Sequence, residues 1–322
     1  MSSAQPSERL RAIPRAPLLG APTPVERLER FEAAIRSPYP IFIKRDDAIP
    51  FGFGGNKVRK LELVMAEALR RGATTVITCG GVQSNHCRAT AAAAARLGLR
   101  CHVVLSGERP VSLSGNTRLD ELFGATLHFV PGLLDRQNRM SALAVELEAK
   151  GEKAFVIPLG ASTPLGAVGL ALGFLELVDQ GHRPDVLVHA SSSGGTQGGL
   201  LAGIALAGLD VRVIGVSADE PQAALAATVE ALEQGVLHLA GADLGPRPAE
   251  VWDGFVGEGY GIPTEASKEA QRLLARSEAI VVDHTYTAKA LAGLIALVRE
   301  QSLPAGSSIL FWHTGGQVGA LA

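Results

Sequence analysis

The feature that most constrains the fold of this chain is an alternation of short β-branched runs with longer Ala/Leu-rich amphipathic runs, which starts near Ile41. Gly, Asp or Ser residues separate the two kinds of run and mark the turns between them. Most of the β-branched runs, such as TVITC and VLVHA, are apolar almost throughout, as strands are when helices cover both faces of a parallel sheet. The pattern therefore predicts repeated strand–helix–strand units and an α/β fold.

The number of such units indicates how the chain is divided. There are too many candidate strands for one typical sheet, so we expect two three-layer α/β domains with mostly parallel sheets. No low-complexity linker separates them, which places the boundaries in ordinary loops, and we expect a large domain of residues 1–58 and 165–322 and a small domain of residues 59–164. The candidate strands are 41–45, 75–79, 101–105, 126–130, 154–158, 186–190, 211–216, 279–283 and 308–312, and the candidate helices are 61–69, 89–97, 140–149, 200–207, 268–275 and 288–298.

Composition excludes several other classes of protein. The chain holds 30 basic and 32 acidic residues, mixed along its length, so no positive field would attract a nucleic acid. Its cysteines, 3 in number, lack metal-ligand spacing, which predicts reduced thiols, a cytoplasmic location and no structural metal site. The N-terminal segment has no apolar run of signal-peptide length and the long uncharged stretches are interrupted by Pro or polar residues, so we expect no membrane span.

The segment FGFGGNKVRK, residues 51–60, is the most informative about chemistry. It follows a candidate strand and places Lys57 directly after Gly54, Gly55 and Asn56 at the start of a helix. The glycines permit positive φ angles and close approach of a ligand. A lysine on such a turn can lose part of its hydration, which lowers its pKa and frees a neutral amine for Schiff-base chemistry. An ordinary exposed lysine at a helix start is the alternative interpretation.

The segment TCGGVQSNH, residues 78–86, ends one candidate strand and opens an Ala-rich helix. Ser84 or Asn85 is suited to cap that helix, and the free backbone N–H groups of Ser84, Asn85 and His86 would form a site for a carboxylate. Helix capping alone explains the same residues. The segment therefore predicts either a substrate-carboxylate site or a plain helix cap.

The segment SSSGGTQGG, residues 191–199, follows the strand VLVHA and precedes an apolar helix. Its small residues expose several backbone N–H groups at the positive end of the helix, and the hydroxyls of Ser193 and Thr196 add further donors. A phosphate group would fit there, although the spacing matches neither a P-loop nor a dinucleotide fingerprint. A simple glycine-rich connection remains the alternative.

Polar residues also follow the candidate strands near the C-terminus. Tyr286 and Thr287 come after one of them and Thr314 after another, and Tyr260 lies in a loop between glycines. The carboxyl ends of parallel strands are where an α/β fold collects its functional groups. Each residue taken singly could also be an ordinary turn or surface residue.

Together these segments resemble one family. GGNKVRKLE, QSNH, VIPLGAS, SSSGGT, GYGIP, YTAKALAGL and HTGG occur in the order found in the branch of pyridoxal-phosphate enzymes that contains 1-aminocyclopropane-1-carboxylate deaminase and D-cysteine desulfhydrase. The resemblance extends from about Thr23 to Gly316. It implies pyridoxal 5'-phosphate (PLP) as cofactor, the fold of the tryptophan synthase β chain (PLP fold type II), a small amino acid as substrate and a homodimer.

The resemblance also implies roles for the matching residues. Lys57 matches the lysine that holds the cofactor covalently and moves the substrate proton, and Asn85 matches the residue that contacts the pyridine hydroxyl. Thr314 is the preferred partner of the pyridine nitrogen, with Thr287 as the alternative. The implied catalytic residues are Lys57, Ser84, Tyr260 and Tyr286; the cofactor-binding residues are Lys57, Lys60, Asn85, Ser193, Gly194, Gly195, Thr196, Thr287 and Thr314; and the substrate-binding residues are Ser84, Asn85 and His86.

Within this branch, three positions favour the desulfhydrases. The deaminases proper carry Glu at the position of Thr287, a non-hydroxyl residue at that of Thr314, and Gln at that of His86. The resemblance therefore implies α,β-elimination of D-cysteine to pyruvate, ammonia and hydrogen sulfide. L-Cysteate sulfo-lyase and 1-aminocyclopropane-1-carboxylate deaminase activities are the closest alternatives, followed by a synthase or dehydratase of the same fold. A catalytically idle amino-acid-binding protein on this fold is the alternative that is not an enzyme.

Overall fold

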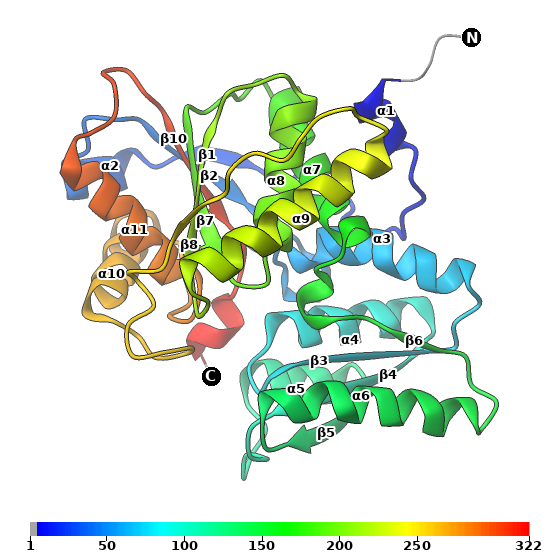
Figure 1. Ribbon diagram of the computed structural model, residues 1–322. Coiled ribbons are helices and arrows are strands. Elements are labelled where there is room, and N and C mark those ends of the chain that lie inside the picture. The colour runs from blue at the N-terminus through cyan, green and yellow to red at the C-terminus, as the bar shows by residue number, and fades with distance from the viewer. Residues whose placement is uncertain (1–4, 322) are drawn as a thin grey trace.

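Two mostly parallel sheets form the core of the protein, which confirms the predicted α/β class. The computed structural model describes residues 5–321 and shows the sheets in separate halves of the molecule (Figure 1). One sheet has the strand order β1-β2-β10-β7-β8-β9 and the other β5-β4-β3-β6. Among the strand pairs of residues 5–321, only that of β1 with β2 is antiparallel. The strands are β1 Val25–Arg27, β2 Ile41–Arg45, β3 Thr75–Gly81, β4 Arg100–Ser106, β5 Thr126–Val130, β6 Ala154–Val156, β7 Val186–Ser191, β8 Arg212–Ser217, β9 Glu250–Trp252 and β10 Ile309–His313.

Helices cover both faces of each sheet, and all six predicted helices are present, each starting earlier in the chain than predicted. None of the helices within residues 5–321 combines the length and apolar character needed to cross a membrane. The α-helices are α1 Pro6–Arg11, α2 Glu29–Ile35, α3 Lys57–Arg70, α4 Asn85–Leu97, α5 Gly115–Leu122, α6 Leu133–Glu148, α7 Pro164–Asp179, α8 Gly195–Leu206, α9 Gln222–Ala240, α10 Glu265–Glu278 and α11 Thr287–Glu300.

Helix α7 escaped prediction because it is buried on nearly all sides. It packs against α3, α8 and α9, and ten of its residues are buried, among them Val168, Leu170 and Phe174. A helix enclosed in this way has no polar face, so it lacks the 3.6-residue alternation by which surface helices are recognised. Its start is nevertheless signalled by Thr163, whose side chain accepts a hydrogen bond from the N–H of Gly166.

The predicted strand at 279–283 is wrong, because this segment is irregular in the structure. Ala279 ends α10 in the left-handed conformation, with φ of 56°. Ile280 and Val282 are buried in the core, as strand residues would be. Two backbone carbonyl groups of this segment, however, bond to side chains instead of to a neighbouring strand. Val281 O is 3.0 Å from His313 Nε2, and Val282 O accepts a hydrogen bond from Gln271 Nε2. An apolar run with buried side chains is thus satisfied here without a sheet ladder.

The division of the chain follows the distribution of the strands. Strands from residues 25–45 and 186–313 build the larger sheet, and strands from residues 75–156 build the smaller one. The predicted boundary at 58/59 falls inside α3, which packs against both α7 and α4. The domain limits themselves stay a prediction.

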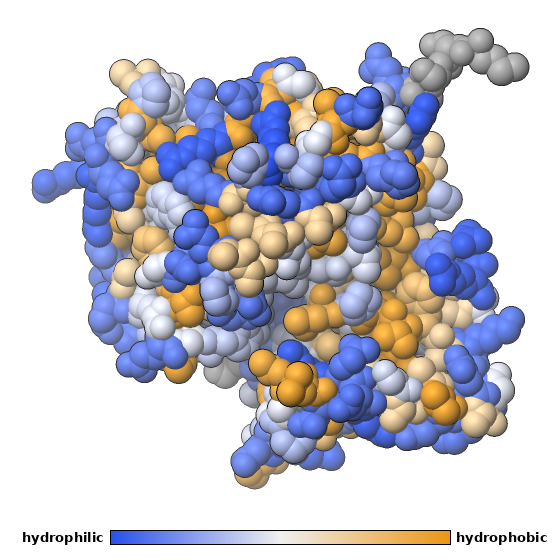
Figure 2. All heavy atoms as spheres, viewed as in Figure 1, coloured by the Kyte–Doolittle hydropathy of each residue, from blue (hydrophilic) through white to orange (hydrophobic). Residues whose placement is uncertain are grey.

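The carboxyl ends of β3, β7, β8 and β10 lead into the loops that face the space between the two halves. In the space-filling view the molecule is hollowed between its upper and lower parts (Figure 2). The strand topology thus brings residues far apart in the sequence to one cleft, as expected for ligand sites of open α/β sheets.

Candidate active site

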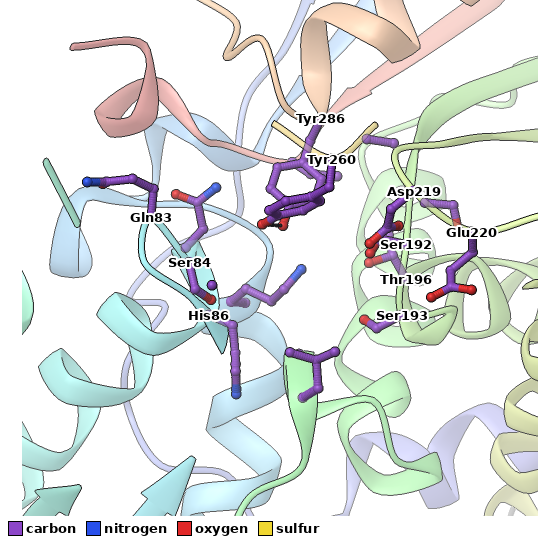
Figure 3. Close-up of a pocket in the computed structure, with 18 of the residues that line it drawn as sticks. Gln83, Ser84, His86, Ser192, Ser193, Thr196, Asp219, Glu220, Tyr260 and Tyr286 are labelled. Carbon is purple, nitrogen blue, oxygen red and sulfur yellow. Dashed lines mark hydrogen bonds between the residues drawn. The ribbon is translucent and has the colours of Figure 1, made fainter. Parts of the chain in front are cut away.

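A cavity of about 540 Å³ lies between the two sheets. In the close-up, Gln83, Ser84 and His86 lie on one side of it, and Ser192, Ser193 and Thr196 on the other (Figure 3). Lys60, Gly195 and Thr287 do not line the cavity itself. The predicted site residues that do line it are Lys57, Ser84, Asn85, His86, Ser193, Gly194, Thr196, Tyr260, Tyr286 and Thr314.

Lys57 is the first residue of α3, and the loop before it is tightly folded. Gly54 has φ of 71°, and a Cβ there would lie 2.4 Å from the carbonyl oxygen of Asp47, so only glycine fits. Lys57 Nζ is 3.3 Å from Asn56 Oδ1. Burial, with a smaller contribution from the positive charge of Arg88, lowers the pKa of Lys57 to about 8, while Asp283 acts in the opposite direction. An appreciable fraction of the amine is therefore neutral near neutral pH, unlike that of an ordinary exposed lysine.

Arg88 holds this loop in place. Its guanidinium, on α4, donates hydrogen bonds to the carbonyl oxygens of Gly52 and Gly54, the latter at 3.1 Å. The side chain is almost completely buried. Arg88 thus fixes the backbone that presents Lys57 and also disfavours protonation of its amine. The sequence pattern gave no signal for this role, since the contact joins residues more than thirty positions apart.

The Ser193–Thr196 loop forms the start of α8, where the first backbone N–H groups of a helix have no carbonyl partner within the helix. Thr196 Oγ1 accepts a hydrogen bond from Asn56 Nδ2 at 2.9 Å, which ties the loop to the residue before Lys57. Ser193 Oγ is 2.7 Å from Ser162 Oγ. The loop is thus anchored by side chains on two other segments, as a preorganised anion site requires.

Lys60 lies against the same loop, and its contact with a bound phosphate stays a prediction. Its amine donates to Ser162 Oγ at 3.1 Å and to Gly160 O at 3.2 Å. A Cβ on Gly195 would lie 2.7 Å from the Lys60 amine, so a glycine is needed for this approach. Burial, followed by the charge of Lys57, holds the pKa of Lys60 well below its usual value.

These residues fit a phosphorylated aldehyde cofactor. Within residues 5–321, neither the Lys57 nor the Lys60 amine forms an ion pair with a carboxylate. Two buried amines without a counterion, next to a helix N-terminus, would be stabilised by a phosphate dianion. Lys57 also offers the amine to which an aldehyde can attach. PLP carries both groups.

Ser84 and Asn85 stand at the start of α4, with the geometry of a helix cap. Ser84 Oγ accepts a hydrogen bond from the N–H of Cys87 at 3.3 Å. Asn116 Nδ2 donates to Asn85 Oδ1 at 3.0 Å and to Gln83 O at 2.8 Å. The Asn85 oxygen is therefore engaged, which leaves its NH2 group as the donor available to a ligand. Neither Asn116 nor Gln83 was predicted, although Gln83 lies inside the segment that was singled out.

His86 lines the cavity, but its ring is bonded on the side of β3. Its Nε2 is 2.7 Å from Thr78 Oγ1, and the Thr78 hydroxyl donates to Ile157 O. Because that hydroxyl has a single proton, Nε2 must carry the imidazole hydrogen, and Nδ1 is a buried acceptor without a partner among residues 5–321. Burial, with the charges of Lys57 and Lys60, holds the pKa of His86 well below its usual value. The ring is therefore neutral, and its substrate contact stays a prediction.

The structure separates the two threonines proposed for the pyridine nitrogen. Thr287 Oγ1 donates to Asp283 Oδ1 at 2.6 Å and accepts from the Asp283 N–H at 2.9 Å. This hydroxyl is fully buried and faces the carboxylate rather than the cavity. Thr314, directly after β10, lines the cavity. Of the two, only Thr314 is therefore placed to meet a ligand in the cavity, and its contact with the pyridine nitrogen stays a prediction.

Tyr260 and Tyr286 meet at the upper edge of the cavity (Figure 3). Their hydroxyls are hydrogen-bonded, and their rings are 5.7 Å apart at an angle of 75°. Burial of the hydroxyl end raises the pKa of Tyr260 to about 12, even though 43% of the whole residue is exposed, and burial also holds the pKa of Tyr286 well above its usual value. Both phenols are thus protonated at neutral pH. Since one donates to the other, one O–H of the pair remains free to donate to a third group.

Charged residues that sequence reasoning missed also line the cavity. Asp219 and Glu220 follow β8, and Arg136 lies on α6. Burial raises the pKa of the Asp219 carboxyl. The rule that polar groups gather after the carboxyl ends of strands could have identified Asp219 and Glu220, because the strand before them was predicted.

The comparisons with known proteins agree with this site. The chain belongs to the family of pyridoxal-phosphate dependent enzymes, whose sequence profile matches residues 17–315, and within it to the branch of 1-aminocyclopropane-1-carboxylate (ACC) deaminase and D-cysteine desulfhydrase. It is 41% identical to D-cysteine desulfhydrase of Salmonella typhi over 325 residues, which cover 97% of this chain and 96% of that protein. The identity to D-cysteine desulfhydrase of Salmonella paratyphi A is 42% over 328 residues, with the same coverage.

Solved structures confirm the predicted fold type. An ACC deaminase homologue superposes with a TM-score of 0.91 at 33% identity, covering 98% of this chain and 96% of that chain. Maize serine racemase, at 18% identity and a TM-score of 0.69, covers 98% of this chain and 94% of its own and shares the fold alone. The protein is thus a PLP-dependent enzyme of fold type II.

Proposed function

We propose that this protein is a carbon–sulfur lyase that converts D-cysteine and water to pyruvate, ammonia and hydrogen sulfide. The observation that carries the proposal is the placement of an amine of lowered pKa, Lys57, in the same cavity as a hydrogen-bonded pair of protonated phenols, Tyr260 and Tyr286. An elimination needs a base for the Cα proton and an acid for the leaving group. The 41% identity to D-cysteine desulfhydrase supports the choice of substrate.

The residues of the cavity divide into those that hold the cofactor and those that face the substrate. Lys57 would tether the cofactor. Its phosphate would be held by the loop amides, the hydroxyls of Ser193 and Thr196, and the Lys60 amine. The Asn85 NH2 group would donate to the ring hydroxyl, and Thr314 would contact the ring nitrogen. When bound, the cofactor supplies the electron sink that makes the substrate Cα–H bond acidic.

The chain's own groups would then carry the proton transfers. Ser84 and the backbone N–H groups at the start of α4 bind the substrate carboxylate, which fixes Cα relative to Lys57. The Lys57 amine, released when the substrate amine takes its place on the cofactor, would take the Cα proton. The free O–H of the tyrosine pair donates a proton to the departing sulfur, a step that positioned acids accelerate by about 10²- to 10⁴-fold.

The substrate is tested by a panel assayed with the purified, PLP-loaded protein. D-Cysteine should yield sulfide and pyruvate in equal amounts, with lower rates for L-cysteine. Release of sulfite from L-cysteate, or of 2-oxobutanoate from 1-aminocyclopropane-1-carboxylate, at a higher kcat/KM than D-cysteine turnover would replace the proposed substrate. A yellow protein that turns over none of the substrates would support the idle binding protein.

The role of Lys57 is tested separately. Borohydride reduction followed by peptide mass spectrometry should locate the cofactor on Lys57, and Lys57→Ala should abolish both the attachment and turnover. Lys268→Ala, at a solvent-exposed lysine of α10, serves as the control. Attachment at any other lysine would contradict the assignment. The cytoplasmic location, the homodimer and the absence of a nucleic-acid partner stay predictions.

A further inference from the structure

Lys289 is a buried amine for which the proposed reaction has no use. It lies on α11, three residues after Tyr286, and its side chain is fully buried. Its Nζ donates to Val256 O at 2.7 Å and to Gly259 O at 2.9 Å. Among residues 5–321 the Lys289 amine forms no ion pair with a carboxylate. Burial lowers its pKa, and the negative charges of Asp219 and Asp283 partly offset this lowering. Its hydrogen bonds therefore serve one segment of backbone.

That segment is the loop that carries Tyr260. It runs from Asp253 to Thr264 between β9 and α10 without regular secondary structure. Gly257 has φ of 69° and Gly259 has φ of 151°, conformations that other residues rarely adopt. Glycine-rich backbone has many accessible conformations, so holding it in one requires external contacts. The Lys289 amine bonds the carbonyl of Gly259, the residue directly before Tyr260.

The same helix holds the other tyrosine. Asp283 Oδ2 accepts hydrogen bonds from the N–H groups of Thr285 at 3.0 Å and Tyr286 at 2.9 Å, which holds the turn that leads into α11. The segment from Asp283 to Lys289 thus fixes Tyr286 through the Asp283 carboxylate and reaches the Tyr260 loop through the Lys289 amine. The Asp283 contact holds Tyr286 and the Lys289 contact holds the residue before Tyr260, and the hydroxyls of these two tyrosines are hydrogen-bonded to each other.

We propose that Lys289 is a positioning residue, which sets the Tyr260 hydroxyl against that of Tyr286 by clamping the loop before Tyr260 to α11. The inference deepens the proposed function, since it rests on the tyrosine pair as the acid for the leaving group. Loss of the clamp should misplace that acid. It should leave the base, Lys57, in place.

The geometry is tested first without reference to turnover. The chain has 3 tyrosines, so the holoenzyme labelled with 3-fluorotyrosine should give three ¹⁹F resonances, assigned by single Tyr→Phe variants. Lys289→Met removes the donors but keeps most of the side-chain volume. It should shift or broaden the resonances of Tyr260 and Tyr286 and leave that of Tyr39, whose hydroxyl donates to Leu303 O, unchanged. Superimposable spectra would overturn the proposal.

A second readout separates positioning from general damage to the enzyme. With D-cysteine in D2O, Lys289→Met should reduce elimination by at least tenfold while Cα-proton exchange, which needs only the base, stays within about twofold. Lys289→Met in the Tyr260→Phe background should cause no further loss, because both changes act through the same hydroxyl. Equal losses of exchange and elimination, or full additivity, would contradict the positioning role.

Two further variants keep the test decisive. Lys44 is another fully buried lysine, whose amine donates to Thr23 O and pairs with Glu176, so Lys44→Met should lower stability without changing the ratio of exchange to elimination.

If Lys289→Met does not fold, Lys289→Gln is the second variant. Its side chain retains a donor group but is too short to reach both carbonyls, so it should move the same two resonances. Unmoved resonances in that variant would refute the clamp. A failure of the D-cysteine assay alone would instead refute the proposed substrate, since the spectra do not depend on turnover.

Discussion

Asn116 orients Asn85: its side-chain NH2 group donates to Asn85 Oδ1 at 3.0 Å and thereby commits that oxygen to the protein. Asn116 is fully buried on α5, and it also bonds Gln83, so a residue remote in sequence fixes two sides of one loop. The orientation of the Asn85 amide is thus decided before any ligand arrives.

Asn116→Ala should therefore weaken cofactor binding. The Asn85 amide loses its fixed orientation and Gln83 O loses a donor, and a buried group left unpaired costs about 1–3 kcal/mol. We expect the dissociation constant for PLP to rise by about 5- to 150-fold, measured by absorbance titration of the protein freed of cofactor. Asn116→Asp, which replaces the donor by an acceptor, should bind at least as weakly; unchanged affinity in both variants would show that the contact is not used.

The lowered pKa of Lys57 predicts a pH profile for cofactor attachment. Only the neutral amine reacts with an aldehyde, and its fraction increases as pH rises through about 8. The attachment rate, followed by stopped-flow absorbance, should therefore rise to a plateau above pH 8, whereas the rate for free lysine keeps rising toward its own pKa of about 10.4.

The same pKa predicts how the stability of the cofactor-free protein depends on pH. Its free energy of unfolding should increase between pH 8 and 10.5, because in this range the unfolded chain binds a proton at Lys57 that the folded chain does not.

Removing the positive charge of Arg88 should move this profile. Because Arg88 contributes to lowering the pKa of Lys57, Arg88→Met should shift the midpoint of attachment to higher pH. Arg88→Lys keeps the charge near the loop and should give a smaller shift. A midpoint that does not change in Arg88→Met would mean that burial alone sets the pKa.

The two threonines can be told apart by isosteric substitution. Thr314→Val should change the visible absorbance of the bound cofactor and lower its affinity, because Thr314 lines the cavity and the substitution removes its hydroxyl. Thr287→Val should instead lower the free energy of unfolding by about 1–3 kcal/mol, since Asp283 loses a buried hydrogen bond. Absorbance spectra and urea unfolding measure the two effects. The reverse pattern would reassign the ring contact to Thr287.

A single methyl group should be enough to damage the anion site. A Cβ at position 195 would lie 2.7 Å from both Lys60 Nζ and Ser162 Oγ, so Gly195→Ala must displace one of them. We expect at least a tenfold loss of affinity for pyridoxal phosphate and a smaller loss for pyridoxal, which lacks the phosphate. Gly245→Ala, at a glycine with open space around it, is the matched control, and equal losses for both ligands would argue against a phosphate site.

The sequence predicted the fold well where the signal is local. Strands such as 75–79 and 186–190 are buried on both faces, and their apolar runs follow directly from that environment. The run 279–283 has the same composition, but its carbonyls bond to His313 and to Gln271, and no local pattern reports such partners. The apolar residues were placed correctly in the core, and only their backbone pairing was wrong.

The site residues likewise divide into those that a local sequence pattern marks and those that depend on contacts between distant parts of the chain. Lys57, Ser84, Ser193 and Thr196 stand at glycine-rich turns between a strand and a helix, where chemistry and spacing coincide in one short segment. Arg88, Asn116 and Lys289 act through contacts to backbone or side chains that are about thirty positions away, and each sits in an unremarkable helix. Such supporting residues become visible only when the chain is folded.

Helix α3, which begins with Lys57, has consequences for how the molecule melts. Leu63 packs with residues of α7 to α9, whereas Leu61, Val64 and Met65 pack with the smaller sheet. Unfolding either half alone would expose one apolar face of this helix to water. The contacts left in the other half do not compensate for the free-energy cost of that exposure. Calorimetry should therefore record one cooperative heat-absorption peak for both halves. The reactive amine of Lys57 stands on the helix that joins them.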